Sequence, residues 1–318
     1  MSLLLAIRGA GDNWAVSPWK ARFEARLPGH KVWIDGIDAY DPAAVRYAAV
    51  WKPQPGLLAG LKNLQVIFNL GAGVDALLED KTLPNLPLVR VANDDLTTRM
   101  TEYVVLHALM HHRRMPMLLD AQRRGEWLAK DQWAAKDVRV GLMGLGVLGQ
   151  HSAAALRMIG FQVNGWSRSP RAVEGVRTFS GADGFDAFLG VTDILVVLMP
   201  LTAETRGILD MRLFRKLARD GVMGAPIIIN AGRGGLQVEA DILAALDDGT
   251  LGGASLDVFQ TEPLPLESRL WSHPKVIVTP HNAADSDPDA ISEYIAEQML
   301  AHMQGRPLRN VVDRAKGY

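Results

Sequence analysis

The segment Val138–Gly149 reads VRVGLMGLGVLG and decides the fold. An apolar run leads directly into the glycine pattern G-x-G-x-x-G, and a helical pattern with three consecutive alanines follows. In this arrangement the first glycine makes a tight turn, the second lets a pyrophosphate approach the backbone, and the third lets the helix pack closely. Free N–H groups at the helix start favour an anion. The segment therefore predicts a dinucleotide-binding turn, whose candidate contacts are Gly144, Gly146, Val147, Leu148 and Gly149.

Short apolar runs alternate with helical patterns on both sides of this segment, which is typical of a parallel sheet covered by helices. A long helix is expected from Thr98 or Thr101 to about Arg114. A second, amphipathic helix is expected over Pro288–Gln304. The predicted fold class is α/β, with two Rossmann-like domains (flavodoxin-like plus dinucleotide-binding), parallel sheets and an interdomain cleft. The predicted strands are Leu3–Ile7, Lys31–Ile34, Ala48–Trp51, Gln65–Leu70, Leu88–Val91, Val138–Met143, Phe161–Trp166, Asp193–Met199, Pro226–Ala231, Gly253–Val258 and Val276–Thr279.

The composition is that of a globular protein that binds small molecules. The chain has 318 residues, 48% of them hydrophobic and 22% charged, with a formal net charge of -1. This balance favours neither nucleic acid nor an anionic membrane as a partner. The absence of cysteine excludes disulfides, thiolate catalysis and cysteine-ligated metals. No stretch approaches the roughly 20 apolar residues needed to span a bilayer, and no signal peptide is evident, so a cytoplasmic protein is expected.

The strand after the glycine turn indicates which nicotinamide cofactor is bound. Proteins that prefer NAD place an acidic residue at the end of this strand, where it accepts hydrogen bonds from the ribose 2′-OH. Here Phe161–Trp166 is followed by Ser167, Arg168 and Ser169, and the first carboxylate is Glu174. Hydroxyls and a guanidinium would bind a 2′-phosphate. We therefore expect NADPH, with NADH as the weaker alternative; the other interpretation is a solvated loop without a role in specificity.

Three polar segments follow later strands, at the end of a parallel sheet where ligands bind. Ile227–Gly234 reads IIINAGRG, Leu256–Pro263 reads LDVFQTEP, and Val276–Ala284 reads VIVTPHNAA. The reactive side chains that they contribute are Arg233, Glu262 and His281.

These segments resemble the N-x-x-R-G, D-V-F-x-x-E-P and T-P-H motifs of the D-isomer-specific 2-hydroxyacid dehydrogenase family. The resemblance covers essentially the whole chain in the family's order and includes GAGVD at Gly71–Asp75. It is greatest to the glyoxylate/hydroxypyruvate reductase A branch, where the second strand also ends in W-S-R and the tail is similar to Val312–Tyr318. The resemblance implies a substrate-binding domain of residues 1–99 and 285–318, a dinucleotide-binding domain of residues 100–284, and a homodimer.

The chemistry of 2-keto acid reduction explains the three reactive residues. Arg233 is suited to hold the substrate carboxylate and polarise the carbonyl, because its fork makes paired hydrogen bonds. His281 is the expected proton donor, since imidazole ordinarily titrates near neutrality. Glu262 would accept a hydrogen bond from the second ring nitrogen and orient the ring. No metal is required. Each residue alone could equally be structural, but their joint order behind a cofactor turn favours catalysis.

Further contacts are expected, the first of them from the same resemblance. The loop after Gln65–Leu70 would offer backbone N–H groups to the substrate carboxylate, although a plain turn would have similar residues. Asn230 and Asp257 are expected to hydrogen-bond within their loops. The remaining substrate-binding candidates are Trp51, Ala72 and Gly73, with Arg233; Trp51, at the end of a predicted strand, could equally be a packing residue. The remaining cofactor-binding candidates are Pro200, Ala231 and Asp257.

Two other signals are interpreted as structural. His107 and His111 stand one helical turn apart, but no third ligand is evident, so no metal site is predicted. Trp271 is expected to lie in the core.

The sequence therefore predicts an NADPH-dependent reductase of small 2-keto acids such as glyoxylate and hydroxypyruvate. An NAD(P)-dependent dehydrogenase of a bulkier 2-keto acid is the alternative within this class. Phosphoglycerate dehydrogenase is disfavoured, because the acidic residue typical of NAD binding and a C-terminal regulatory domain are missing. A regulator that senses the cofactor without turnover is the alternative in another class. Such a regulator would not need Arg233, Glu262 and His281, and all three are present.

Overall fold

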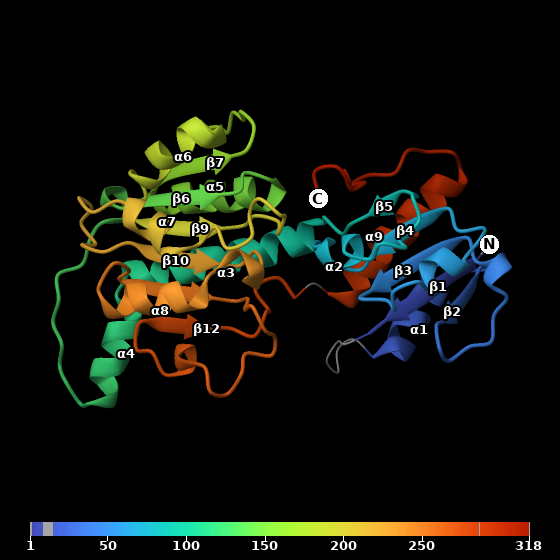
Figure 1. Ribbon diagram of the computed structural model, residues 1–318, viewed down its shortest axis with the longest axis horizontal. Helices are drawn as coiled ribbons and strands as arrows, with labels where there is room; N and C mark the ends of the chain where they lie inside the picture. The colour runs from blue at the N-terminus through green and yellow to red at the C-terminus, as the bar shows by residue number, and fades with distance from the viewer. Residues whose placement is uncertain (1, 9–14, 286, 318) are drawn as a thin grey trace. The chain divides into compact units, whose positions relative to one another are not determined.

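The computed structural model describes residues 2–8, 15–285 and 287–317. The chain forms two compact units (Figure 1). Unit 1 comprises residues 1–96 and 286–318, and unit 2 comprises residues 97–285. The junctions predicted from the sequence, at 99/100 and 284/285, lie within a few residues of these boundaries.

Unit 1 is built on a five-stranded sheet with the order β2-β1-β3-β4-β5. Every pair of neighbouring strands is parallel. This 2-1-3-4-5 order is the flavodoxin-like order that the sequence predicted. The strands are β1 (Ser2–Ile7), β2 (Lys31–Ile34), β3 (Tyr47–Trp51), β4 (Val66–Asn69) and β5 (Leu88–Val89).

Alternate residues of these strands face two separate cores, as the two-residue period of a strand requires. One face packs against α1 (Val16–Arg26) and α9 (Pro288–Met303), with Trp19 and Phe23 fully buried. The other face packs against the segments after β3 and β4, including α2 (Asp75–Leu78). The C-terminal helix α9 thus completes the core of the N-terminal unit, which explains why unit 1 is discontinuous in sequence.

Unit 2 contains a seven-stranded parallel sheet with the order β12-β11-β10-β9-β6-β7-β8. Numbered from β6, the order is that of a dinucleotide-binding domain, and it reverses between β6 and β9. Ligands of such sheets bind at the carboxyl ends of the strands beside that reversal. The strands are β6 (Arg139–Met143), β7 (Gln162–Ser167), β8 (Arg177–Ser180), β9 (Ile194–Val197), β10 (Ile227–Asn230), β11 (Gly253–Leu256) and β12 (Val276–Val278).

Helices cover both faces of this sheet (Figure 1). α3 (Asp94–His112) and α5 (Val147–Ile159) pack on one face. α6 (Gly181–Leu189), α7 (Met211–Lys216) and α8 (Glu239–Asp247) pack on the other. The central strands are therefore buried on both sides, which is why they read as continuous apolar runs in the sequence. The remaining helices of the described residues are α4 (Met115–Arg123) and the 3-10 helices Pro42–Ala44, Leu58–Gly60, Ala135–Asp137, Gly234–Leu236 and Arg269–Trp271.

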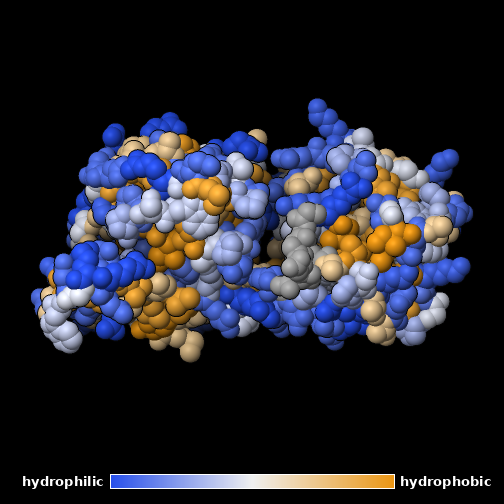
Figure 2. All heavy atoms as spheres, turned by 90° about the horizontal axis from the view of Figure 1, so that it is seen from below, coloured by the Kyte–Doolittle hydropathy of each residue, from blue (hydrophilic) through white to orange (hydrophobic). Residues whose placement is uncertain are grey.

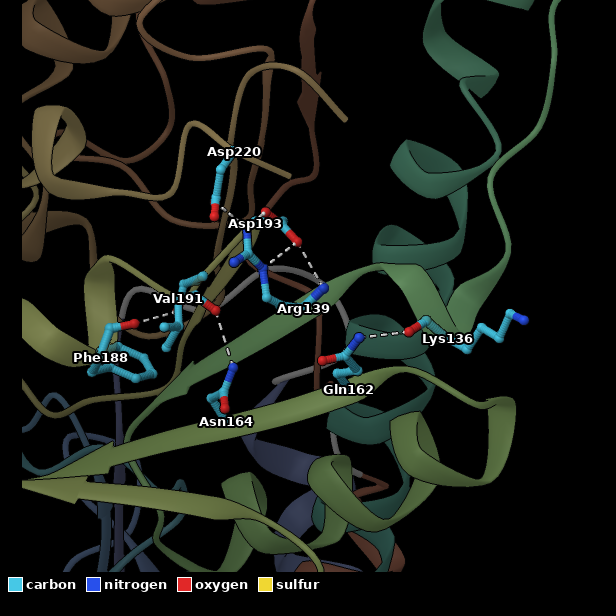
Figure 3. Close-up of polar contacts among 9 residues, drawn as sticks. Lys136, Arg139, Gln162, Asn164, Phe188, Val191, Asp193 and Asp220 are labelled. Atoms are coloured by element: carbon cyan, nitrogen blue, oxygen red, sulfur yellow. Dashed lines mark hydrogen bonds and ion pairs between the residues drawn. The ribbon is translucent and has the colours of Figure 1, made fainter. Parts of the chain in front are cut away.

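Polar contacts join the amino ends of β6, β7 and β9 (Figure 3). Arg139 donates two side-chain hydrogen bonds to the buried carboxylate of Asp193, at 3.0 and 2.8 Å, and a third to Asp220 at 2.7 Å. The backbone N–H of Arg139 also donates to Asp193, at 2.8 Å. A buried carboxylate needs such donors, because removing one partner of a buried pair is strongly destabilising. The edge of the sheet opposite the carboxyl ends thus has a structural role.

Three predictions of local structure were wrong or incomplete. The helix expected from Thr98 or Thr101 begins at Asp94, because the Asn93 side chain accepts a hydrogen bond from the N–H of Leu96 at 3.0 Å and caps the helix start. The strand β8 was not predicted, since one of its four residues is exposed, the other three are only partly buried, and they form no apolar run. Trp271 is not a core residue: it is 50% exposed, and its indole N–H donates to the Pro265 carbonyl at 3.0 Å.

Apolar residues form separate patches among polar ones on the face drawn in Figure 2. None of the helices in the described part of the chain has the length and apolar character that crossing a membrane requires.

The two histidines of α3 share one buried partner. His107 Nδ1 and His111 Nε2 lie 2.8 and 2.9 Å from the hydroxyl oxygen of Ser255 in β11. Burial lowers the pKa of His107 to about 4 and that of His111 to about 3. Both rings are therefore neutral at pH 7. Across the described residues, no group of three histidine, aspartate or glutamate side chains could hold a metal ion.

These histidines predict an acid-sensitive fold. A histidine whose folded pKa lies below its unfolded value of about 6.5 stabilises the protein above that pH, and the stabilisation is lost as the pH falls toward the folded pKa. Between about pH 7 and about pH 5, we expect each of the two to remove about 2 kcal/mol from the free energy of unfolding. Urea denaturation at both pH values measures this loss. His111→Gln should weaken the pH dependence, whereas His30→Gln on the surface should leave it unchanged.

Candidate active site

The glycine-rich turn has the geometry that the sequence predicted. Gly144 has φ +114°, and a Cβ atom there would lie 2.7 Å from the Leu198 carbonyl oxygen. A Cβ atom on Gly149 would lie 1.9 Å from the Gly144 oxygen, so only glycine lets α5 approach the turn this closely. Gly146 directly precedes α5, and apart from its two chain neighbours no described residue lies within 4 Å of the position that a Cβ atom would take there. Open space above a helix start is the form that a phosphate site requires.

The loop after β7 lies beside this turn. Arg171 donates from Nη1 to the Leu145 carbonyl at 3.0 Å, which ties the loop to the glycine-rich turn. Ser167 donates to the carbonyl of Ser169 at 2.8 Å. An open hollow of about 390 Å³ adjoins this loop, and its lining residues are Pro170, Arg171, Ala172, Thr178, Phe179 and Ser180. The predicted specificity loop is thus tied to the glycine-rich turn by a hydrogen bond and adjoins this hollow.

An acidic residue near Arg168 was not predicted. The Thr202 hydroxyl donates a 2.8 Å hydrogen bond to Glu204, and this bond is the main cause of the lowered pKa of Glu204; the charge of Arg168 contributes as well. Arg168 therefore lies close enough to the loop after β9 for its charge to act on Glu204. The predicted contact Pro200 lies in this loop, and its carbonyl accepts a hydrogen bond from Thr205 at 2.9 Å.

Arg233 stands on a turn that Asn230 holds in place. The Asn230 side chain accepts from the N–H of Gly232 at 3.0 Å and donates to the Arg233 carbonyl at 3.2 Å. The Arg233 guanidinium donates from Nη1 to the Gly232 carbonyl at 2.7 Å. Ala231, in the same turn, is buried and donates to the Val197 carbonyl at 3.3 Å. Asn230 thus has the loop-forming role expected for it.

Glu262 and His281 form a hydrogen-bonded pair. His281 Nδ1 lies 2.7 Å from Glu262 Oε2. The other carboxylate oxygen accepts from the N–H of Phe259 at 3.0 Å, so both oxygens of Glu262 have a partner. With the carboxylate on Nδ1, the Nε2 side of the ring is directed away from Glu262. This is the arrangement of an imidazole that exchanges a proton at one nitrogen and is oriented through the other.

Two residues that the sequence did not predict bring the Arg233 and Glu262 loops together. A Cβ atom on Gly234 would lie 1.8 Å from the Phe259 carbonyl oxygen, so the two loops are in backbone contact. The buried Gln237 accepts from Asn230 at 2.8 Å and donates to the Val258 carbonyl at 2.9 Å. Gly234 ends the N-x-x-R-G motif, but that motif does not indicate the contact with Phe259, and no local pattern indicates the contacts of Gln237.

Asp257 supports the segment that carries His281. Its carboxylate accepts from the Thr279 hydroxyl at 2.7 Å and from the N–H groups of Asn282 and Ala283 at 3.0 and 3.1 Å. Its carbonyl accepts from the N–H of His281 at 2.8 Å. Burial raises the pKa of Asp257, although these hydrogen bonds oppose the shift. The expected role in loop hydrogen bonding agrees with these contacts, and a direct contact with the cofactor stays a prediction.

The predicted substrate loop of unit 1 is organised by Asn69, which no sequence pattern indicated. The buried Asn69 amide donates to the carbonyls of Gly71 and Gly73 at 2.8 and 2.9 Å. In a planar trans peptide the N–H points opposite to the C=O, so the N–H of Ala72 points away from Asn69. Trp51 packs on this loop, because a Cβ atom on Gly71 would lie 2.5 Å from its ring. Trp51, Ala72 and Gly73 are therefore neighbours within unit 1.

Comparison with known proteins identifies the family. The family model described as D-isomer specific 2-hydroxyacid dehydrogenase, NAD binding domain, matches residues 105–283. The chain belongs to the D-isomer specific 2-hydroxyacid dehydrogenase family. This family membership, the α/β fold with two parallel sheets and the assignment as an oxidoreductase were all predicted from the sequence, and they are confirmed.

Relatives within this family cover nearly the whole chain. Glyoxylate/hydroxypyruvate reductase A from Serratia proteamaculans is 41% identical, over 94% of this chain and 96% of the relative. The NADPH-dependent glyoxylate/hydroxypyruvate reductase from Sinorhizobium meliloti, solved with NADP and sulfate, is 46% identical with a TM-score of 0.93. A probable 2-hydroxyacid dehydrogenase from Rhizobium etli, solved with NADP, HEPES and L(+)-tartaric acid, is 43% identical with a TM-score of 0.94. Both alignments with solved structures cover 100% of this chain and 99% of the relative.

Proposed function

We propose that this dehydrogenase reduces small 2-keto acids, with glyoxylate and hydroxypyruvate as substrates and NADPH as the cofactor. The observation that carries the proposal is the hydrogen-bonded Glu262–His281 pair, with 2.7 Å between its atoms. The two residues stand on the loops after β11 and β12, which belong to the same sheet as β6, the strand before the glycine-rich turn. The names of the relatives from Serratia proteamaculans and Sinorhizobium meliloti support the substrates, and the NADP in two solved relatives supports the cofactor.

Some residues of unit 2 would bind the cofactor, and others would carry out the reaction. The open space above Gly146, at the start of α5, would take the pyrophosphate, and Arg168 with Ser167 and Ser169 would take the 2′-phosphate. When bound, NADPH supplies the hydride. Arg233 holds the substrate carboxylate and polarises the carbonyl, and His281 donates the proton to the carbonyl oxygen from Nε2. Glu262 keeps the ring oriented through Nδ1.

The proposal also assigns roles to the two units. Unit 1 binds the substrate carboxylate through the loop that contains Ala72 and Gly73, with Trp51 beside it, and unit 2 binds the dinucleotide. The working enzyme is a cytoplasmic homodimer. Light scattering of the purified protein tests the dimer, for which a mass of one chain would be the contrary result.

A substrate panel tests the function. Initial rates are measured with glyoxylate, hydroxypyruvate, pyruvate and a bulkier 2-keto acid such as phenylpyruvate, each with NADPH and with NADH. The proposal expects the highest kcat/KM for one of the first two acids with NADPH. A preference for the bulkier acid would move the assignment to the alternative within the family. Absence of turnover with every acid, despite tight NADPH binding, would favour a cofactor-sensing regulator.

Arg168→Asp tests the choice of cofactor. The new carboxylate would repel the 2′-phosphate and could accept hydrogen bonds from a ribose 2′-OH. We expect kcat/KM for NADPH to fall about a hundredfold, while kcat/KM for NADH stays equal or rises. Arg212→Asp, on the exposed start of α7, makes the same charge change and should alter neither value. Equal losses with both cofactors would contradict a role for Arg168 in recognising the phosphate.

A further inference from the structure

A chain of hydrogen bonds links helix α3 to the loop that carries His281. The Tyr103 hydroxyl lies 2.9 Å from Thr279 Oγ1, and Thr279 donates to Asp257 Oδ1 at 2.7 Å. A hydroxyl has one proton to donate. Because Thr279 gives its proton to the carboxylate, the Tyr103 hydroxyl is the donor to Thr279. Burial raises the pKa of Tyr103, so its hydroxyl keeps the proton that this bond requires.

The loop that carries His281 has an unfavourable backbone conformation. His281 has φ +54°, in the left-handed region that residues other than glycine seldom adopt. Such a residue persists only where its surroundings hold it in place. Here Asp257 does so, because its carbonyl accepts from His281, and its carboxylate accepts from the two N–H groups that follow. The orientation of the His281 ring therefore depends on the position of Asp257.

The α3 end of this series of hydrogen bonds is also held in place. The Tyr103 ring packs on His107, with 4.0 Å between ring centroids. His107 contacts the Ser255 hydroxyl, and Ser255 stands two residues before Asp257 in the segment that contains β11. The contacts thus form a closed ring. It runs from Ser255 in β11 through His107 and Tyr103 in α3 to Thr279 after β12, and returns to Asp257. In a closed ring of contacts, each side chain is restrained by two neighbours and moves less than a side chain with a single hydrogen bond would.

We propose that Tyr103 is a positioning residue for His281, acting through Thr279 and Asp257. Its hydroxyl fixes Thr279, which then holds the Asp257 carboxylate where it can accept from the His281 loop. The inference rests on the proposed function, since the position of His281 affects turnover only if His281 donates the proton. It adds a determinant that is remote from the reacting atoms and that comes from a helix not otherwise assigned to the site.

Tyr103→Phe tests the proposal, because it removes the hydroxyl and keeps the ring on His107. We expect kcat for glyoxylate to fall about tenfold, with KM for NADPH within about twofold of the unmodified enzyme. Tyr47→Phe is the matched control, since it removes the hydroxyl of another buried tyrosine, one that lies 3.0 Å from a histidine ring nitrogen within unit 1. Thr279→Val should lose activity like Tyr103→Phe, and Thr279→Ser should restore most of it.

A second readout needs no turnover. The ring proton signals of His281, assigned by their loss in His281→Asn, should shift or broaden in Tyr103→Phe and stay unchanged in Tyr47→Phe. Unchanged signals together with an unchanged kcat would overturn the proposal. So would a loss of kcat accompanied by an equal rise in KM for NADPH, which would indicate general damage to unit 2. If the unmodified enzyme reduces no 2-keto acid while the His281 signals still respond to Tyr103→Phe, the proposed function fails and the positioning role stands.

Discussion

His281→Asn is expected to lower kcat for glyoxylate reduction by about a thousandfold, because proton transfer by a positioned side chain contributes that much. Asparagine suits this test, since it adopts the left-handed backbone of φ +54° more readily than most residues. The loop should therefore keep its shape while the proton donor is lost. Stopped-flow reduction with saturating NADPH measures the rate, and quenching of protein fluorescence measures NADPH binding, which should be preserved.

Two further variants make this result specific. Glu262→Gln should lower kcat by at least about a hundredfold, because the ring loses the carboxylate on Nδ1 that fixes its tautomer. His273→Asn should have no effect, since His273 lies by Asp247 at 3.5 Å, away from the Glu262 pair. If His281→Asn kept more than about a tenth of the activity, another group would have to donate the proton.

Arg233→Met should lower kcat/KM for glyoxylate by about ten-thousandfold, with NADPH binding retained. The substitution removes both the anchor for the carboxylate and the charge that stabilises the developing oxyanion. Arg233→Lys should recover only a small part of this loss, because an ammonium keeps the charge and lacks the planar fork. Steady-state rates at saturating NADPH give both values.

The matched control for this pair is Arg212→Lys, an exposed substitution of the same kind within unit 2. Recovery by Arg233→Lys to within about threefold of the unmodified enzyme would mean that charge alone suffices. In that case the paired hydrogen bonds assigned to the guanidinium would be wrong.

Much of the fold could be predicted because it is encoded locally. The strands buried on both faces of the unit 2 sheet are apolar runs, and the turn at Gly144 has a pattern of its own. β8 was missed for the converse reason, since a partly exposed edge strand lacks such a run. The start of α3 was misplaced because Asn93, rather than either threonine, caps it. Trp271 shows that a large aromatic residue need not be buried when its N–H finds a nearby carbonyl.

The candidate site likewise contains residues that a local sequence pattern encodes and residues that no such pattern encodes. Residues at strand ends, such as Arg233 and His281, could be predicted because the carboxyl ends of parallel strands meet at one edge. The residues behind the loops of the site could not be predicted, since Gln237, Asn69 and Tyr103 make contacts that no local pattern encodes. A buried amide or phenol has no periodicity that distinguishes it from an ordinary core residue. The roles of these three residues can be recognised only when their hydrogen bonds are known from the structure.

The alternation of side chains along β11 limits how this enzyme can change by insertion or deletion. Ala254 and Leu256 face the core beneath α6, α7 and α8, while Ser255 turns to the opposite side and meets the α3 histidines. Adding or removing one residue would exchange the two sides. The serine would then enter an apolar layer, and a leucine would meet two imidazoles. Length variation in β11 should therefore abolish folding and activity together, whereas substitutions that keep its length can affect either one separately.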